Sequence, residues 1–304
     1  MKILSNRIII FLLLGAASVL NLSDARAWND VASLEELGNA TYKGVENTPL
    51  TLSDGYWEGS PYMEGGASRP RAGLLKEMRF NGDLDGDAHP ETVVIIWHSA
   101  GGTGSHTHLA VMKRQRCTVE NIATALIGDR VKLRGGRIES GKVILEVLQS
   151  GEQDAMCCPS VLATRTWWLQ EGQLEEGEVE VTGKLELAAL TGSGWTLTHL
   201  NTDEPVPAGA EVTLKFDVER VSGKSACNRY SAGIKDGANA GDLDIGPTAS
   251  TRMACPDQLM EVEHQYLEAL THVESFSFHA GQLALSGQNE DATRFTMLFD
   301  PKEK

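Results

Sequence analysis

Basic residues are scarce in this sequence. Its 304 residues include 27 Lys and Arg against 42 Asp and Glu, which gives a formal net charge of −15. A chain this acidic, without any block of basic residues, is a poor candidate for binding nucleic acid or an anionic lipid surface. Cysteine is also sparse. Five residues are too few for a fold built on disulfides, although they suffice for one or two bridges.

The motifs of common catalytic sites are missing as well. The sequence contains no G-x-S-x-G nucleophile elbow, no H-E-x-x-H zinc motif and no phosphate-binding P-loop. The glycine-rich stretch 101–104 (GGTG) is not followed by a helix pattern, which argues against a dinucleotide site. Glu261 and Glu263, in a predicted helix, are expected to face solvent rather than to form an acid–base pair. We therefore predict no catalytic residue.

A long apolar run occurs only at the N-terminus. After a basic start, residues 8–20 are almost entirely apolar, and residues 25–27 (ARA) have the small–x–small pattern that signal peptidase recognises. This run is shorter than the roughly 20 residues that span a bilayer. Residues 1–27 are therefore predicted to be a signal peptide cleaved before Trp28. The mature chain is expected in the periplasm or outside the cell, without a transmembrane segment.

Two β-rich halves are predicted, so the expected fold class is mainly β (α+β). The first half covers residues 28–170, the charge-rich stretch 171–187 is predicted to be a linker, and the second half covers residues 188–300. A helix is predicted at 256–270, where apolar residues recur at helical spacing. The strand candidates are short β-branched, aromatic and aliphatic runs at 78–80, 92–97, 109–112, 130–134, 142–148, 164–169, 195–198, 211–216, 275–278, 282–285 and 294–299.

Several linked motifs in the second half carry a resemblance to a known family. Trp195, residues 221–230 (VSGKSACNRY), residues 245–255 (IGPTASTRMAC) and the acidic helix follow one another in the order and spacing of the META domain, also called the HslJ-like domain. The resemblance implies a bent sheet with one packed helix, in bacterial envelope proteins associated with heat shock and novobiocin tolerance, and no established catalytic residues. Ala226 departs from the pattern, which usually has Gly there. The first half resembles an uncharacterised exported β-rich domain, which implies no function.

Export determines how the cysteines are interpreted, because thiols pair in an oxidising compartment. Cys227 and Cys255 lie 28 positions apart. A structural bridge is predicted between them, since a redox-active pair would favour C-x-x-C spacing. Cys157 and Cys158 are adjacent, and a bridge between neighbours is strained, so one of them is predicted to pair with Cys117 instead, with Cys157 as the candidate. One cysteine then remains unpaired.

The sharpest candidate for a ligand site is the acidic segment 81–91 (NGDLDGDAHPE). Asp83, Asp85, Asp87 and Glu91 occupy relative positions 1, 3, 5 and 9, a spacing that lets their carboxylates converge on a hard cation such as calcium. The spacing resembles calcium loops between two strands rather than an EF-hand. We predict a structural calcium site, and the alternative is an acidic turn without an ion.

Histidines and tryptophans provide two weaker candidates. Four of the eight histidines lie close together, at positions 89, 98, 106 and 108. His106 and His108 would share one face of a strand, as in a His-x-His zinc pair, but no carboxylate partner is evident and scattered surface histidines are the favoured interpretation. Trp97, Trp167 and Trp168 suit either a platform for sugars or peptides or, as is more usual, core packing.

These observations favour a non-catalytic exported META-domain protein. It would act as an envelope stress-response or binding module for an unknown envelope protein or ligand, with calcium holding its first half. One alternative is a metal-dependent hydrolase that uses Asp83, Asp85 and Asp87 with nearby histidines. Another is an inhibitor or adhesion module that docks a partner through its loops.

Overall fold

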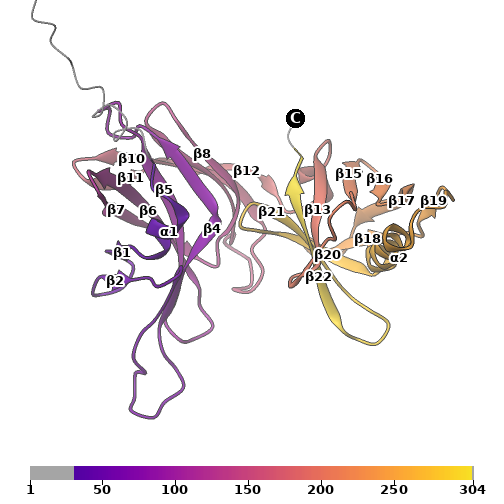
Figure 1. Ribbon diagram of the computed structural model, residues 1–304, viewed down its shortest axis with the longest axis horizontal. Helices are drawn as coiled ribbons and strands as arrows, with labels where there is room; N and C mark the ends of the chain where they lie inside the picture. Colours follow the sequence, from indigo (N-terminus) through magenta and orange to yellow (C-terminus); the bar gives the residue numbers. More distant parts are fainter. Residues whose placement is uncertain (1–30, 303–304) are drawn as a thin grey trace, which may run out of the picture.

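The computed structural model describes residues 31–302, so the predicted signal peptide and its cleavage site lie outside the described residues. The chain is mostly β-structure, arranged in three large antiparallel sheets and one two-stranded sheet, which confirms the predicted fold class. The first half lies at the left of Figure 1 and the second half at the right. Within residues 31–302, no helix is long and apolar enough to cross a membrane.

Two five-stranded sheets form the first half. The first sheet has the order β3 (Tyr56–Glu58), β4 (Arg71–Gly82), β5 (Glu91–Ser99), β6 (His106–Gln115) and β7 (Thr118–Asp129). The second sheet has the order β11 (Gln173–Glu176), β10 (Val161–Gln170), β9 (Lys142–Gln149) and β8 (Lys132–Glu139), with β12 (Glu180–Lys184) also paired to β10.

The central strands β5 and β6 are buried on both faces. One face of β5, with Val93 and Ile95, packs in a core shared with β8, β9 and β10 of the second sheet. The other face, with Val94 and Ile96, packs beneath α1 (Leu34–Gly38), β1 (Thr41–Tyr42) and β2 (Leu50–Thr51). A strand covered on both faces carries apolar side chains at successive positions, which explains the continuous run at 92–97. Trp167 is buried in the first of these cores.

The predicted linker at 171–187 is wrong. Residues 173–176 and 180–184 form β11 and β12, which pair in succession with the same edge of β10. Gly172, at φ 76°, makes the turn that returns the chain onto this edge. An edge strand has a solvent-facing side where charged residues are common, so its composition resembles that of a linker. The second sheet therefore extends to Lys184.

A single curled sheet forms most of the second half. Its strand order is β18 (Leu243–Ile245), β17 (Asn228–Asp236), β16 (Arg220–Ser225), β15 (Thr213–Asp217), β13 (Gly194–Asn201), β22 (Arg294–Pro301), β21 (Gln282–Gln288) and β20 (Val273–His279), with β14 (Glu204–Pro205) and β19 (Ala249–Ser250) at its margins. A 3₁₀ turn, η1 (Leu187–Ala189), precedes it. Helix α2 (Asp257–Thr271) matches the predicted helix and buries Val262, Tyr266 and Leu270 against the sheet.

The two halves share a packed junction (Figure 1). Leu148 and Leu162, from the second sheet of the first half, belong to the core of the second half. The Arg134 guanidinium lies 4.7 Å from the centre of the Phe278 ring. The Gly281 N–H also donates a hydrogen bond to the Leu133 carbonyl oxygen at 2.9 Å. Apolar packing thus continues from one half into the other.

Candidate functional site

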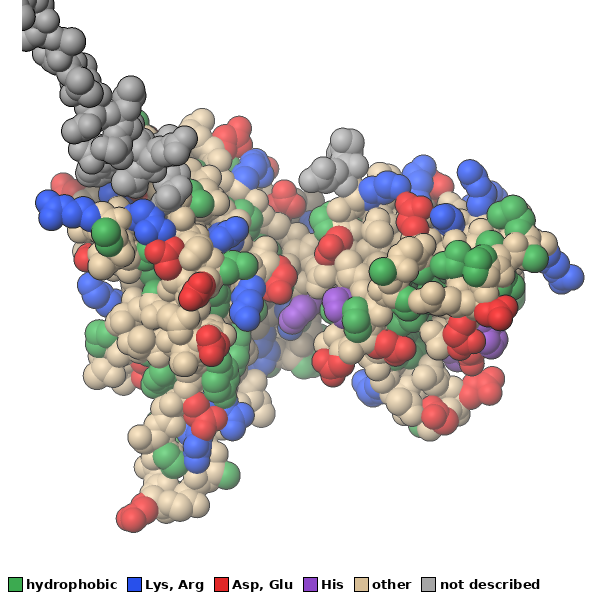
Figure 2. All heavy atoms as spheres, in the orientation of Figure 1, with side chains coloured by type: hydrophobic (Ala, Val, Ile, Leu, Met, Phe, Trp, Pro, Cys, Tyr) green, Lys and Arg blue, Asp and Glu red, His purple; other side chains and the backbone are tan. Residues whose placement is uncertain are grey.

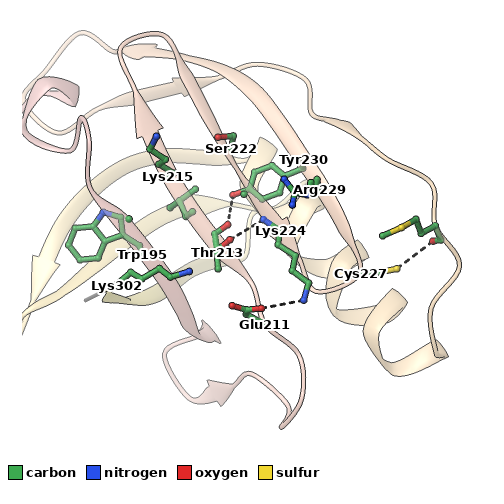
Figure 3. Close-up of a pocket in the computed structure, with 14 residues that line it drawn as sticks. Trp195, Glu211, Thr213, Lys215, Ser222, Lys224, Cys227, Arg229, Tyr230 and Lys302 are labelled. Atoms are coloured by element: carbon green, nitrogen blue, oxygen red, sulfur yellow. Dashed lines mark hydrogen bonds and ion pairs between the residues drawn. The ribbon is translucent and has the colours of Figure 1, made fainter. Parts of the chain in front are cut away.

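An open groove of about 720 Å³ lies on the second half, over β13, β15, β16 and β17 (Figure 3). Strand pairing builds it from residues far apart in the sequence. Lys215 pairs with Ser222, and Lys224 pairs with Arg229. Alternate residues of a strand share a face, so these polar side chains lie on the face opposite the buried Leu214 and Phe216. We call this feature the basic groove.

The floor of the basic groove depends on one glycine. A Cβ atom at Gly223 would lie 1.9 Å from the Thr213 carbonyl oxygen, so β15 and β16 approach too closely for any side chain there. The same carbonyl accepts a hydrogen bond from the Tyr230 hydroxyl at 3.1 Å, and the Thr213 hydroxyl accepts one from the Lys224 N–H at 3.0 Å. This bonding holds the backbone of the floor in a defined position.

Cationic side chains line the basic groove on several sides. They come from Lys215, Lys224, Arg229 and Lys302, against a single lining carboxylate, Glu211. Lys224 pairs with Glu211 at 3.3 Å, and Lys215 pairs with Asp217 at 3.4 Å. The structure records no carboxylate partner for Arg229 or Lys302 among the described residues. Lys and Arg side chains gather at the upper edge of this half, whereas Asp and Glu gather near α2 (Figure 2).

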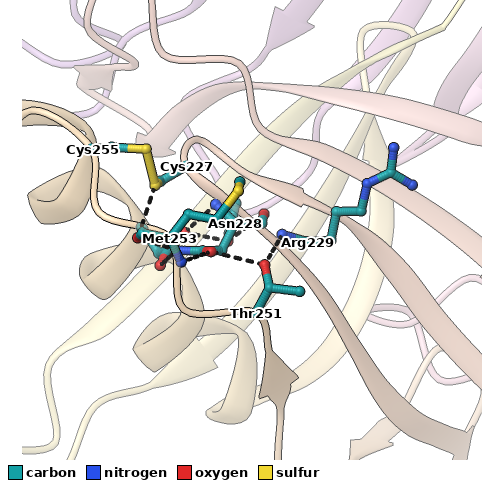
Figure 4. The surroundings of a disulfide bond; sticks show 8 residues. Cys227, Asn228, Arg229, Thr251, Met253 and Cys255 are labelled. Atoms are coloured by element: carbon teal, nitrogen blue, oxygen red, sulfur yellow. Dashed lines mark hydrogen bonds between the residues drawn. A yellow bond between two sulfur atoms is a disulfide. The ribbon is translucent and has the colours of Figure 1, made fainter.

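A disulfide and a buried asparagine shape the wall beside the basic groove (Figure 4). The structure contains the predicted bridge between Cys227 and Cys255. Asn228 is buried, and its Oδ1 atom accepts hydrogen bonds from the Met253 N–H at 2.7 Å and the Thr251 hydroxyl at 2.8 Å. The bridge and these bonds hold the segment that brings Met253 to the groove. Ala226, the departure from the META pattern, has a φ of 69°, in the left-handed region that favours glycine.

The expectation that Glu263 faces solvent is wrong. Its side chain belongs to α2 and is 7% exposed. One carboxylate oxygen accepts hydrogen bonds from the Ser225 hydroxyl and the Asn228 N–H, both at 2.7 Å, and the other accepts one from the Asn228 side-chain amide at 2.8 Å. Glu263 falls within the apolar stripe of the helix, and this position is the sequence feature that could have predicted its burial. Glu261 is exposed, as expected.

The predicted calcium ligands lie together at the turn between β4 and β5. One oxygen from each of Asp83, Asp85 and Glu91 lies within 4.8 Å of the others, and Glu91 is fully buried. The Lys113 ammonium, from β6, contacts Asp85, Asp87 at 2.7 Å and Glu91 at 3.1 Å. Although burial opposes it, hydrogen bonding to these carboxylates raises the pKa of Lys113. Lys113 thus supplies positive charge at the position where the sequence predicted a metal ion.

We expect Lys113→Met to destabilise the chain by about 2 kcal/mol in EDTA, because the buried Glu91 carboxylate loses its cationic partner. Calcium should restore part of this loss in the variant while changing the wild-type melting temperature by less than about 1 °C. Thermal unfolding with and without calcium measures both effects, and Lys132→Met, at an exposed site, is the matched control. A wild-type stabilisation by calcium that disappears in Asp85→Ala would instead establish the calcium site.

Of the four clustered histidines, only His89 belongs to the acidic turn, where its N–H donates a hydrogen bond to the Asp87 carboxylate at 2.9 Å. The other three lie away from that turn, although the hydrolase hypothesis requires histidines beside the carboxylates. His98 is the next-to-last residue of β5, whereas Glu91 is its first, and the seven residue steps between them span about 24 Å. His106 and His108 lie beside His98 at that far end. Burial, together with the neighbouring histidines, lowers the pKa of His108 to about 4, so this imidazole is neutral at pH 7.

The predicted pairing of Cys117 with Cys157 is wrong. The structure joins Cys157 to Cys158 and leaves Cys117 free and exposed. Cys117 lies in the turn between β6 and β7 of the first sheet, whereas Cys157 belongs to the connection between β9 and β10 of the second. That connection is organised by Asp154, which accepts hydrogen bonds from the Gly151 and Ser160 N–H groups at 2.7 Å.

Comparison with known proteins finds a family match in the second half. The family model of the META domain matches residues 188–298, which confirms the resemblance found in the sequence. None of the curated proteins compared matches the chain. Among solved structures, the chain is similar to the NMR structure of a protein from Burkholderia xenovorans, at 27% identity. That similarity covers 39% of this chain and 87% of the other, with a TM-score of 0.31.

Proposed function

From the META domain match over residues 188–298, we propose that this chain is a non-catalytic, exported binding protein of the bacterial envelope. Its ligand is an extended chain that carries several carboxylates, such as an acidic peptide segment, and the basic groove is the binding site. Of the two roles suggested for the second half, stress response and binding, the groove supports binding. The N-terminal signal pattern supports export.

The concentration of positive charge in the basic groove carries the proposal. The whole chain has a net charge of −15, yet four cationic side chains and one carboxylate line this groove. A cleft lined by one sign of charge attracts ligands of the opposite sign. Arg229 and Lys302 contribute most directly, because their charges are not matched by a described carboxylate.

The dimensions of the basic groove favour an extended ligand over a single small anion. Its volume of about 720 Å³ is within the range of ligand-binding pockets, and one side is open to solvent. Lys215, Lys224 and Arg229 belong to three neighbouring strands, so their backbones span about 10 Å. In an extended peptide, alternate side chains recur about every 7 Å on one face. Two carboxylates of one chain can therefore reach different cations.

The lining chemistry supports binding rather than catalysis. Ser222 and Thr213 carry the hydroxyls on the solvent-facing side of the strands, and the described residues that line the groove include no histidine to activate either of them. A serine nucleophile requires an adjacent base within hydrogen-bonding distance. A hydroxyl beside lysine side chains serves instead as a hydrogen-bond donor to an anion.

The test starts with the full chain expressed in a bacterium that has a periplasm. We expect recovery from the periplasmic fraction with Trp28 as the first residue, measured by mass spectrometry. The recovered protein should bind a fluorescein-labelled decaglutamate peptide in a fluorescence anisotropy assay. Raising the salt from about 0.05 M to 0.5 M should weaken this binding about tenfold or more, because solvent-exposed charges are screened.

Charge reversal locates the binding site. Arg229→Glu combined with Lys302→Glu should weaken decaglutamate binding at least about tenfold, through loss of attraction and added repulsion. The control combines Lys76→Glu with Arg294→Glu, which gives the same net charge change away from the groove and should alter affinity less than about twofold. Equal losses in both variants, or no binding by the wild type, would overturn the groove assignment. An uncleaved chain retained in the cytoplasm would overturn export.

A further inference from the structure

Two adjacent cysteines form a disulfide at an exposed tip of the second sheet of the first half. Cys157 and Cys158 are joined to each other in the connection between β9 and β10. Both cysteines are exposed, and so are Ala155 and Met156 immediately before them. The bridge therefore lies at the surface of the chain, where molecules in solution reach it.

The base of this tip is held without the bridge. The Asp154 carboxylate accepts hydrogen bonds from the Gly151 and Ser160 N–H groups, both at 2.7 Å, and from the Ser160 hydroxyl at 2.8 Å. These hydrogen bonds, with the one from Gly151 first, lower the pKa of Asp154, so the carboxylate stays ionised at neutral pH. Neither Cys157 nor Cys158 belongs to a hydrophobic core of the described residues. Opening the bridge therefore changes the tip and leaves the ends of β9 and β10 in place.

The bridge between Cys227 and Cys255 has the opposite surroundings (Figure 4). Cys227 is 5% exposed and Cys255 is half-buried. The Asn228 side chain accepts a hydrogen bond from the Met253 N–H at 2.7 Å, which holds the two connected segments together beside this bridge. Exposed disulfides have higher reduction potentials than buried structural ones, and they are the ones with labile, regulatory or catalytic roles. The chain thus carries one bridge of each kind.

We propose that Cys157 and Cys158 form a redox-active site that exchanges two electrons with a dithiol. A dithiol suits this pair, because its two thiols deliver both electrons and close into a disulfide of their own. Reduction converts the closed tip into an open one with two neighbouring thiols. Since Asp154 holds the base, the change stays within residues 155–159. The site does not depend on the function proposed for the basic groove.

The exchange proceeds through a mixed disulfide. A thiolate of the dithiol attacks one Sγ atom and forms a new S–S bond with it, while the bond between Cys157 and Cys158 breaks. The other cysteine leaves as a thiolate and takes up a proton. The second thiol of the dithiol then loses its proton, closes a disulfide within the reductant and displaces the first cysteine, which is protonated in turn. The chain gains two electrons and two protons, and the dithiol is oxidised to a disulfide.

The experiment uses the full chain with Cys117→Ser, which removes a further exposed cysteine that would react with the same reagents. The folded chain is equilibrated with mixtures of reduced and oxidised dithiothreitol, and its free thiols are alkylated and located by mass spectrometry. We expect the bridge between Cys157 and Cys158 to be half reduced at a ratio of reduced to oxidised reagent at least about 100-fold lower than the buried bridge requires. Oxidised dithiothreitol in excess should re-form it.

A second reductant identifies the source of the electrons. Reduced thioredoxin presents its dithiol on a protein surface, whereas dithiothreitol is a small molecule. Reduction of the tip by both reagents assigns a protein dithiol as an accessible donor, and reduction by dithiothreitol alone assigns a small-molecule donor. Reduction by neither, under conditions that reduce the bridge between Cys227 and Cys255, would contradict the proposal.

Matched double variants separate a redox site from an exposed structural bridge. Cys157→Ser combined with Cys158→Ser should abolish the early two-electron uptake and keep the melting temperature of the Cys117→Ser chain within about 2 °C. Cys227→Ser combined with Cys255→Ser should retain the early uptake. The proposal is overturned if the two bridges reduce at ratios within about threefold of each other, if the reduced tip fails to re-form its bridge, or if reducing the tip lowers the melting temperature by more than about 5 °C.

Discussion

Glu263→Ala is expected to lower the free energy of unfolding by about 3–5 kcal/mol, the largest effect of any single substitution considered, because it removes several buried hydrogen bonds to a charged group. The Glu263 carboxylate accepts three hydrogen bonds from Ser225 and Asn228 inside the second half. Removing it leaves the buried Asn228 N–H without its acceptor, while the Ser225 hydroxyl and the Asn228 side-chain amide keep the Asn228 and Met253 carbonyl oxygens as partners. The loss combines three hydrogen bonds to a charged group, each of about 1.5–3 kcal/mol before such compensation, with one buried donor left unpaired. Urea unfolding followed by tryptophan fluorescence measures the loss.

Two variants separate this effect from a general effect on the helix. Glu261→Ala removes an exposed carboxylate two residues away and should change stability by less than about 0.5 kcal/mol. Glu263→Gln keeps an acceptor oxygen but loses the charge, so its stability should lie between those of the wild type and Glu263→Ala. If Glu263→Ala unfolds like Glu261→Ala, the buried network does not contribute to stability.

Removing the bridge between Cys227 and Cys255 is expected to cost about 3–4 kcal/mol. The bridge closes a loop with a sequence separation of 28, and loop-closure entropy in the unfolded chain predicts a loss of this size. The measurement compares the unfolding of the wild type with that of Cys227→Ser combined with Cys255→Ser under oxidising conditions. Dithiothreitol should lower the stability of the wild type toward that of the variant.

The second disulfide provides the control. Cys157 and Cys158 are adjacent, so the loop that their bridge closes is minimal. Its removal should therefore change stability by less than about 0.5 kcal/mol. Equal losses for the two double variants would show that loop closure does not explain the stabilisation. An unchanged stability after removal of the bridge between Cys227 and Cys255 would contradict its structural role.

Local sequence patterns were sufficient for much of the fold. Helix α2 was predicted within one residue at each end, because its apolar spacing depends only on neighbouring turns. The continuous apolar run at 92–97 predicted the central strand β5, because this pattern also lies within one short stretch of the sequence. The linker at 171–187 was the main error, because an exposed edge strand and a linker have similar compositions.

Candidate sites were harder to predict because strand register assembles them. Thr92 pairs with Met112, which places Lys113 next to Glu91 although the two residues are far apart in the sequence. The acidic segment was visible in the sequence, but the lysine that enters it was not. The basic groove likewise joins residues from four strands and the end of the described chain.

The sequence by itself determined the β-rich class, the META domain in the second half, the helix and the pairing of Cys227 with Cys255. These features depend on local periodicity and on motifs whose order and spacing can be read from the sequence alone. Only the tertiary structure decided that Glu263 is buried, that Glu46 contacts His98 and that four cations share a groove. The physical reason is that burial and charge balance depend on which strands lie side by side, and pairing between distant strands leaves no local pattern in the chain.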